Sequence, residues 1–246
     1  MSIYAIGDLH LSLDPRIRKP MDVFGEKWRD HYKRLKENWV RIISEDDTVI
    51  ICGDISWGLK LCEAMADLRW IAGLPGHKVI TKGNHDLWWT SVNKLNTIDE
   101  RITFLQNSAY FAEDVAICGT RGWICPGTEG FDAHDEKIYR REQQRLETSL
   151  RCAAADGAGE IIASLHYPPT NDKFAPSGFT ELLTRYGVGR CIYGHLHGED
   201  AFGRGFRGTL NGVRYDLVSL DYVDAIPVLI RETRHDNGKK SNTDCM

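Results

Sequence analysis

Residues 191–197 read Cys-Ile-Tyr-Gly-His-Leu-His, an apolar run followed by a glycine and two histidines. Short apolar runs rich in Ile and Val are typical of strands buried in a parallel sheet. A glycine at the end of such a strand allows a sharp turn and a close approach of the backbone to whatever lies there. The stretch therefore predicts a buried strand that presents two histidines beyond its carboxyl end.

Four further stretches have the same form, in which an apolar run leads into residues that can bind metal. They are residues 3–10, 49–54, 79–86 and 161–166. In open α/β sheets, ligands collect beyond the carboxyl ends of the strands. The five stretches together predict a polynuclear metal site at one edge of the fold, with the candidate ligands Asp8, His10, Asp54, Asn84, His166, His195 and His197.

The donor atoms of these candidates indicate which metals would bind. Asp8 and His10 lie two residues apart and can converge on one ion, and the two oxygens of Asp54 suit a bridge between two cations. Mixed nitrogen and oxygen ligation suits Mn, Fe or Zn better than Mg or Ca. The set contains no cysteine, so a structural thiolate zinc site is not predicted. Taken alone, His166 would more simply be a hydrogen-bonding residue, and the hypothesis depends on the five stretches occurring together.

Composition restricts the possible classes of protein. The 246 residues are 42% hydrophobic and 27% charged, which is ordinary for a globular chain. The net charge of −4 argues mildly against a protein whose main function is to bind duplex DNA. The seven cysteines are odd in number and form no C-x-x-C pair, which favours a reducing compartment. Without a signal-peptide pattern or an apolar run of about 18 residues, we expect a cytoplasmic protein with no membrane segment.

Hydrophobic periodicity predicts alternating strands and helices in one domain over residues 1–231, with sheets flanked by helices on both faces. Residues 206–219 predict a hairpin around Asn211-Gly212, the dipeptide favoured in tight type I′ turns. The polar residues 232–246 are expected to be flexible. Helices are predicted near 28–42, 60–72, 91–99, 135–155 and 182–187, and strands near 2–6, 48–52, 78–81, 102–105, 115–118, 160–165, 190–193 and 228–230.

In order along the chain, these motifs resemble those of the calcineurin-like metallophosphoesterases. The matching motifs are Asp-x-His at 8–10, Gly-Asp at 53–54, Gly-Asn-His-Asp at 83–86, a lone histidine at 166 and Gly-His-x-His at 194–197. The resemblance covers residues 4–198. It implies an α/β fold of four layers, a two-sheet β-sandwich between helices.

The same resemblance implies a set of roles. One metal ion would be held by Asp8, His10, Asp54 and His197, and a second by Asp54, Asn84, His166 and His195. His85 would contact the scissile phosphate or protonate the leaving oxygen, and Asp86 could orient the ring of His85. The expected activity is hydrolysis of a small phosphomonoester or phosphodiester by in-line attack of a metal-bound hydroxide.

Two departures from the protein phosphatase branch of this family bear on the substrate. The residues after Asp54 lack the arginine of that branch, and Asp86 stands where that branch has Glu. We therefore expect a small bacterial-type phosphohydrolase that acts on a small phosphorylated substrate. The oligomeric state and the roles of the loops 11–25 and 120–133 stay open.

Four residues near strand ends are candidates for substrate contact. Trp57, Trp88 and Trp123 could stack on a substrate, although packing at the rim is the simpler interpretation. Arg121 could bind a phosphate through both guanidinium arms or be an ordinary surface arginine. The remaining histidines, at 31, 77, 134 and 235, are interpreted as surface or helix residues.

Three other functions compete with the leading hypothesis. A nuclease of the same superfamily would need a basic groove, which the composition does not indicate. A scaffold that had lost catalysis should lack ligands, and all seven candidates are present. A metallo-β-lactamase-like hydrolase is not expected, because Glu199 and Asp200 occupy the Asp and His positions of its motif.

Overall fold

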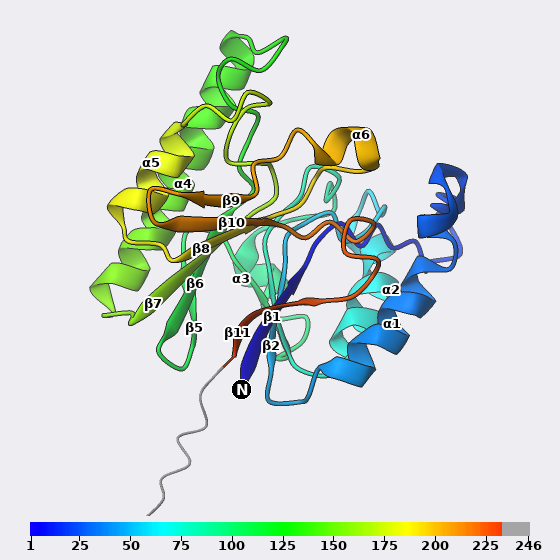
Figure 1. Ribbon diagram of the computed structural model, residues 1–246. Helices are drawn as coiled ribbons and strands as arrows, with labels where there is room; N and C mark the ends of the chain where they lie inside the picture. The colour runs from blue at the N-terminus through cyan, green and yellow to red at the C-terminus, as the bar shows by residue number, and fades with distance from the viewer. Residues whose placement is uncertain (233–246) are drawn as a thin grey trace, which may run out of the picture.

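Two β-sheets stack face to face in the computed structural model, which describes residues 1–232 (Figure 1). The first sheet has the order β11-β1-β2-β3-β4, and the second the order β5-β6-β7-β8-β10-β9. The first comprises β11 (Val228–Glu232), β1 (Ser2–Ile6), β2 (Thr48–Ile51), β3 (His77–Ile80) and β4 (Ile102–Phe104). The second comprises β5 (Ala109–Ala112), β6 (Val115–Thr120), β7 (Glu160–Leu165), β8 (Arg190–Tyr193), β10 (Val213–Leu217) and β9 (Gly208–Leu210).

Helices cover the outer face of each sheet, so the molecule has four layers. Helices α1 (His31–Ile42) and α2 (Leu61–Ala72) lie on the first sheet, and α4 (Ala133–Ala155) and α5 (Gly178–Arg185) lie on the second (Figure 1). A third group of buried side chains, including Val79 and Ile162, fills the space between the sheets. The predicted fold, a two-sheet sandwich flanked by helices on both faces, is confirmed.

The inner strands of both sheets run parallel. Strands β1 to β4 pair in parallel register, as do β6, β7, β8 and β10, while β11, β5 and β9 are antiparallel edges. Beyond the last residue of β1, the N–H of Gly7 donates to the carbonyl of Val218, which follows β10, at 2.8 Å. This contact joins the two sheets at the edge where the parallel strands end.

Most predicted elements are present, with differences at their ends. The helix expected from residue 28 begins at His31, because Trp28 lies in the 3₁₀ turn η2 (Glu26–Trp28) and Asp30 has a left-handed φ of 48°. The hairpin prediction is confirmed, since Asn211 and Gly212 both have positive φ, at 51° and 83°. Short elements that the sequence did not predict are β5, η1 (Asp22–Phe24) and α6 (Glu199–Phe202), and α3 (Val92–Leu95) is shorter than expected.

The structure does not test the predictions for the C-terminal segment and for the domain assignment. Residues 233–246, most of the predicted flexible segment, lie outside the described residues, and the assignment of 1–231 to one domain stays a prediction. Within residues 1–232, no helix is long and apolar enough to cross a membrane.

Candidate metal centre

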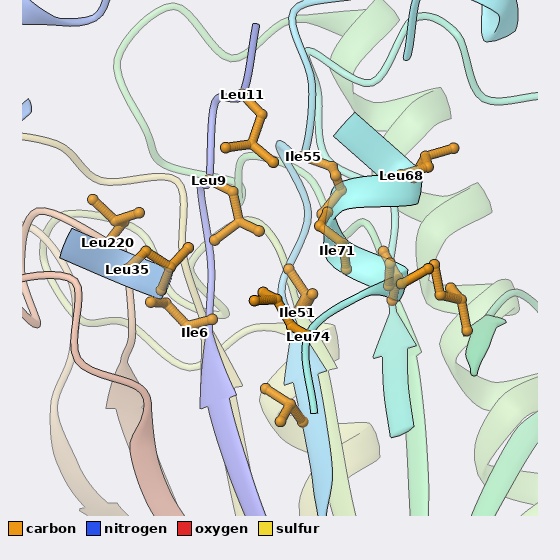
Figure 2. Packing of buried hydrophobic residues seen from close by; sticks show 14 of the residues in the cluster. Ile6, Leu9, Leu11, Leu35, Ile51, Ile55, Leu68, Ile71, Leu74 and Leu220 are labelled. Carbon is orange, nitrogen blue, oxygen red and sulfur yellow. The ribbon is translucent and has the colours of Figure 1, made fainter. Parts of the chain in front are cut away.

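The loops that carry the candidate ligands are anchored in the core by apolar residues that alternate with them. Leu9 and Leu11 are buried on the α1 and α2 side of the first sheet, and Ile55 packs beside them (Figure 2). The N–H of His10 donates to the carbonyl of Asp54, and the N–H of Leu11 to that of Ile55, both at 2.9 Å. The loops after β1 and β2 therefore remain paired beyond the strands, which holds Asp8, His10 and Asp54 together.

Four of the candidate ligands have a strained backbone. Asp8, His10, Asp54 and His195 have φ values of 60°, 44°, 51° and 73°, in the left-handed region that side chains rarely adopt. Each such residue costs on the order of 1–2 kcal/mol, and such strain concentrates at functional sites. The surrounding hydrogen bonds hold these residues in place. The N–H of His195 donates to both carboxylate oxygens of Asp8, at 2.9 and 3.0 Å.

Two glycines allow the closest approaches between the ligand loops. A Cβ atom on Gly83 would overlap the carboxylate of Asp54, and one on Gly194 would overlap the carboxylate of Asp8. These glycines, each one residue before a candidate ligand, therefore have a steric reason to lack a side chain.

One group of donor atoms forms around Asn84, where loops from both sheets meet. Its side-chain oxygen lies 2.7 Å from His166 Nε2 and 2.9 Å from His195 Nδ1. His166 Nε2 is in turn 3.2 Å from His195 Nδ1 and 3.4 Å from Asp54 Oδ2. The structure thus brings together the four residues expected to hold the second ion.

A second group forms around His10 and His197. The Nε2 atoms of these two rings lie 3.3 Å apart, and His197 Nε2 lies 3.5 Å from Asp8 Oδ1. His10 Nε2 is 3.8 Å from Asp54 Oδ2, the same oxygen that faces His166 in the first group. Asp54 Oδ2 therefore lies between the two groups, where a bridging ligand would be. Asp8 is within reach of both groups as well.

The hydrogen bonds of two histidines test whether the residues fit a metal ion. His166 Nδ1 lies 2.9 Å from the carbonyl of Cys52, an acceptor, so this nitrogen carries the proton. His197 Nδ1 likewise faces Asp221 Oδ1 at 3.0 Å. In the neutral rings, each Nε2 lone pair then points at other acceptors, an arrangement that a cation would satisfy. Metal–ligand bonds of about 2.1 Å place neighbouring ligand atoms about 3.0–3.4 Å apart. The donor set fits metal ions.

The electrostatics of the cluster lead to the same conclusion. Burial opposes the charged ring of His166, but Asp54 and Asp8 outweigh it and raise the pKa of His166 to about 9. Burial also opposes the charged ring of His197, yet Asp8 and Asp221 raise its pKa to about 10. In contrast, burial lowers the pKa of His195 to about 3. The buried carboxylates thus create a strong local demand for positive charge, which a cation could supply in place of protons.

The expectation that Asp86 orients the ring of His85 is wrong. Its carboxylate accepts hydrogen bonds from the backbone N–H groups of Asp54, Ile55, Ser56 and Gly83 and from the indole of Trp88. Burial raises the pKa of Asp86 to about 6, with the Asp54 carboxylate adding to the effect, although its N–H donors oppose the rise. Asp86 ties the loop after β2 to the loop after β3.

His85 faces a cavity beside the donor cluster. The cavity has a volume of about 500 Å³, and His10, His85 and His197 border it. Trp57 also lines this cavity and stacks on His10, with ring centroids 4.8 Å apart and planes 23° apart. The backbone N–H of His85 donates to Asp54 Oδ1 at 2.8 Å. This hydrogen bond holds the backbone of His85 in place, while its exposed ring borders the cavity. His85 and Trp57 are therefore placed where a substrate could reach them.

The other predicted substrate residues lie elsewhere. The prediction for Trp88 is wrong, because its side chain is 1% exposed and packs against Trp89 and Phe104 in the core. The guanidinium of Arg121 lies over the ring of Trp123 at 4.4 Å and 3.5 Å from the buried carboxylate of Glu142. Neither Arg121 nor Trp123 borders the cavity that His85 faces, so their contact with substrate stays a prediction.

Sequence reasoning missed several residues next to the candidate centre. Trp28 packs edge-on against His10 and His197, and Asp221 accepts from His197. Tyr167 lies against the ring of His195, with centroids 4.1 Å apart. His31, interpreted as a surface or helix residue, begins α1 but is buried, with Nε2 3.0 Å from the carbonyl of Leu9. His235 lies outside the described residues.

Comparison with known proteins adds a family and a fold. A family model described as calcineurin-like phosphoesterase matches residues 1–199. The Gene 66 protein of Mycobacterium phage D29 is 24% identical over 230 residues, covering 92% of each chain. The Gene 66 protein of Mycobacterium phage L5 is 42% identical over 57 residues, a match that spans 23% of this chain and 27% of that protein. The crystal structure of phosphopantetheinyl hydrolase (PptH) from Mycobacterium tuberculosis superposes with a TM-score of 0.52 at 15% identity, covering 93% of this chain and 95% of that one. This last likeness shows a shared fold.

Proposed function

Because the chain belongs to the calcineurin-like phosphoesterase family, we propose that it hydrolyses a small phosphomonoester or phosphodiester with the help of two metal ions. The proposed ligands are Asp8, His10, Asp54 and His197 for one ion and Asp54, Asn84, His166 and His195 for the other. Their mixed nitrogen and oxygen donors favour Mn, Fe or Zn. The proposed location of the enzyme is the cytoplasm.

The observation that carries this proposal is the arrangement of the imidazole lone pairs. His166 and His197 each commit Nδ1 to an acceptor outside the cluster, at Cys52 and Asp221. Their Nε2 atoms then face Asn84 and Asp54 in one group and Asp8 in the other. Acceptors that face one another are costly in a buried site unless bound protons or a cation lie between them, and a cation can replace the protons here. This geometry supports metal binding independently of the family match.

In the proposed hydrolysis, the bound metal ions, His85 and Asp86 would have different roles. Bound metal ions would supply Lewis acidity and positive charge to the attacking water and to the phosphoryl oxygens. A bond forms between the water oxygen and phosphorus, and the bond from phosphorus to the leaving oxygen breaks. The leaving oxygen needs a proton, and His85 is positioned at the cavity to give it from a ring nitrogen. Asp86 would act indirectly, by holding the two ligand loops together.

The test of this proposal is a reconstitution assay. Metal-free protein is loaded with Mn²⁺, Fe²⁺ or Zn²⁺ and assayed with para-nitrophenyl phosphate and its bis-aryl diester. We expect metal-dependent hydrolysis that falls by more than about 100-fold in Asp54→Asn, because a bridging carboxylate is lost. Asp99→Asn is the matched control, since Asp99 pairs with Arg101 away from the cluster. Full activity of Asp54→Asn would contradict the assignment, and inert protein that binds no metal would favour a non-catalytic scaffold.

A further inference from the structure

The cavity that His85 faces has apolar walls that continue directly from the candidate metal ligands. Trp57 stacks on His10, and Trp28 packs edge-on against His10 at 5.7 Å and against His197 at 5.4 Å. We call this space the tryptophan cavity. Besides these two indoles, its walls include the side chains of Met21, Phe24 and Phe202.

Two segments form the outer wall of the tryptophan cavity. One is the turn region η1–η2, which follows the ligands Asp8 and His10, and the other is α6, which follows His195 and His197. They meet where Lys27 Nζ lies 5.6 Å from the ring centre of Phe202. Phe24 is 68% exposed although it lines the cavity, so part of its ring remains open to a bound group.

The charges of the tryptophan cavity argue against an anionic group in addition to the scissile phosphate. Acidic side chains at its lining are Glu26, Glu199 and Asp221, and Lys27 is the one lysine or arginine among the described residues that line it. Asp221 is already committed to His197 and to the N–H of Gly198. Glu26 pairs with Arg29 at 3.0 Å. A leaving group with further phosphates would therefore find little positive charge beyond Lys27 among the described lining residues, whereas an uncharged apolar group would bury surface against the aromatic rings.

From these observations, and resting on the function proposed above, we propose that the tryptophan cavity binds an uncharged apolar leaving group, the aromatic or alkyl alcohol of the phosphoester. The volume of about 500 Å³ is in the range of pockets that enclose a ring system. Hydrolysis then adds the water oxygen to phosphorus and releases the apolar alcohol, with its oxygen protonated, into this cavity beside His85. Sugar phosphates and nucleoside polyphosphates are poor substrates by this account.

The test compares two esters of primary alcohols, 2-naphthylmethyl phosphate and glycerol 1-phosphate, on the Mn²⁺-loaded enzyme. Phe24→Ala and Phe202→Ala each remove an aromatic wall that does not contact a candidate metal ligand. We expect each variant to lower kcat/KM for the naphthylmethyl ester about tenfold and for the glycerol ester less than about twofold. Phe174→Ala is the matched control, because Phe174 is 41% exposed and packs on Phe206 away from this cavity.

A binding measurement separates recognition from turnover. Calorimetry with 2-naphthylmethylphosphonate, which is not hydrolysed, should show weaker binding to Phe24→Ala and Phe202→Ala, with inorganic phosphate unchanged. Equal losses on both esters, or no loss on either, would overturn the inference while the proposed function stands. If the wild type hydrolysed neither these esters nor an aryl phosphate, the proposed function would fail and this inference with it.

Discussion

Asp221 fixes the ring of His197 from outside the candidate metal centre. Its Oδ1 accepts from His197 Nδ1 at 3.0 Å, and its Oδ2 accepts from the N–H of Gly198 at 2.9 Å. Loss of such a partner typically lowers metal affinity about 10- to 100-fold. We predict a loss in this range for Asp221→Ala, measured by calorimetric titration of metal-free protein with Mn²⁺.

Asp224→Ala is the control for this prediction. Asp224 lies in the same loop, but its side chain is exposed and pairs with Arg34. Unchanged Mn²⁺ affinity in Asp221→Ala would mean that His197 is not held by Asp221 in the metal-bound protein.

Gly194 gives a second prediction for a single residue. A Cβ atom there would overlap the carboxylate of Asp8, so Gly194→Ala should displace that ligand. We expect loss of Mn²⁺ binding with retention of the far-ultraviolet circular dichroism of the wild type. Gly203→Ala is the matched control, because a Cβ atom at Gly203 meets nothing within 4 Å. Full metal binding by Gly194→Ala would show that Asp8 is not a ligand.

The candidate ligands could be found in the sequence because each directly follows a recognisable apolar strand. Asp221 could not, since it lies after β10 without a glycine or a ligand motif beside it. The prediction for Trp88 failed because proximity to a ligand motif does not say which way a side chain points. Trp88 and Asp86, two residues apart, both point inward, where the indole donates to the carboxylate.

Asp86 connects the loop after β2 to the loop after β3. Its carboxylate is fully buried and accepts from backbone groups of the loops after β2 and β3. Asp86→Ala leaves these N–H groups without their acceptor, and hydrogen bonds to a charged group contribute about 1.5–3 kcal/mol. We predict a decrease of about 3 kcal/mol in the free energy of unfolding, measured by urea denaturation. Asp99→Ala, at a half-buried surface pair, should lose less than about 1 kcal/mol. A loss of the same size in both variants would contradict this role.

The elements themselves were predictable where they carry a strong pattern. The strands that lead to the ligands are buried apolar runs, and the amphipathic helices α1 and α2 present regular apolar stripes to the first sheet. Strand β5 was missed because its four residues are mostly half-buried and form one arm of a hairpin at a sheet edge. The turns η1 and η2 and helix α6 are too short for a periodic pattern, yet they form the wall of the tryptophan cavity.

For the whole molecule, the candidate ligands connect the two sheets. Asp8, Asp54 and Asn84 follow strands of the first sheet, and His166, His195 and His197 follow strands of the second. Metal ions bound here would link the two sheets and should therefore stabilise the folded state of the whole chain. At a free metal concentration about 1,000 times Kd, the gain is about 4 kcal/mol.

Removal of metal should lower Tm correspondingly, by about 8–16 °C for a chain of this size. Differential scanning calorimetry of chelated and Mn²⁺-reconstituted protein checks this value. Asp54→Asn is the matched variant, and its Tm should respond to Mn²⁺ much less than that of the wild type. An identical response of both proteins would place the stabilising ions elsewhere.

The central claim is that side chains from five strand ends hold a pair of cations. The most direct measurement is anomalous diffraction from a crystal of the Mn²⁺-loaded protein. The account predicts two anomalous peaks about 3.5–4 Å apart, one on each side of Asp54. One peak would be within bonding distance of His10 and His197, and the other of His166 and His195. Absence of peaks at these residues, or peaks only at other positions, would contradict the account.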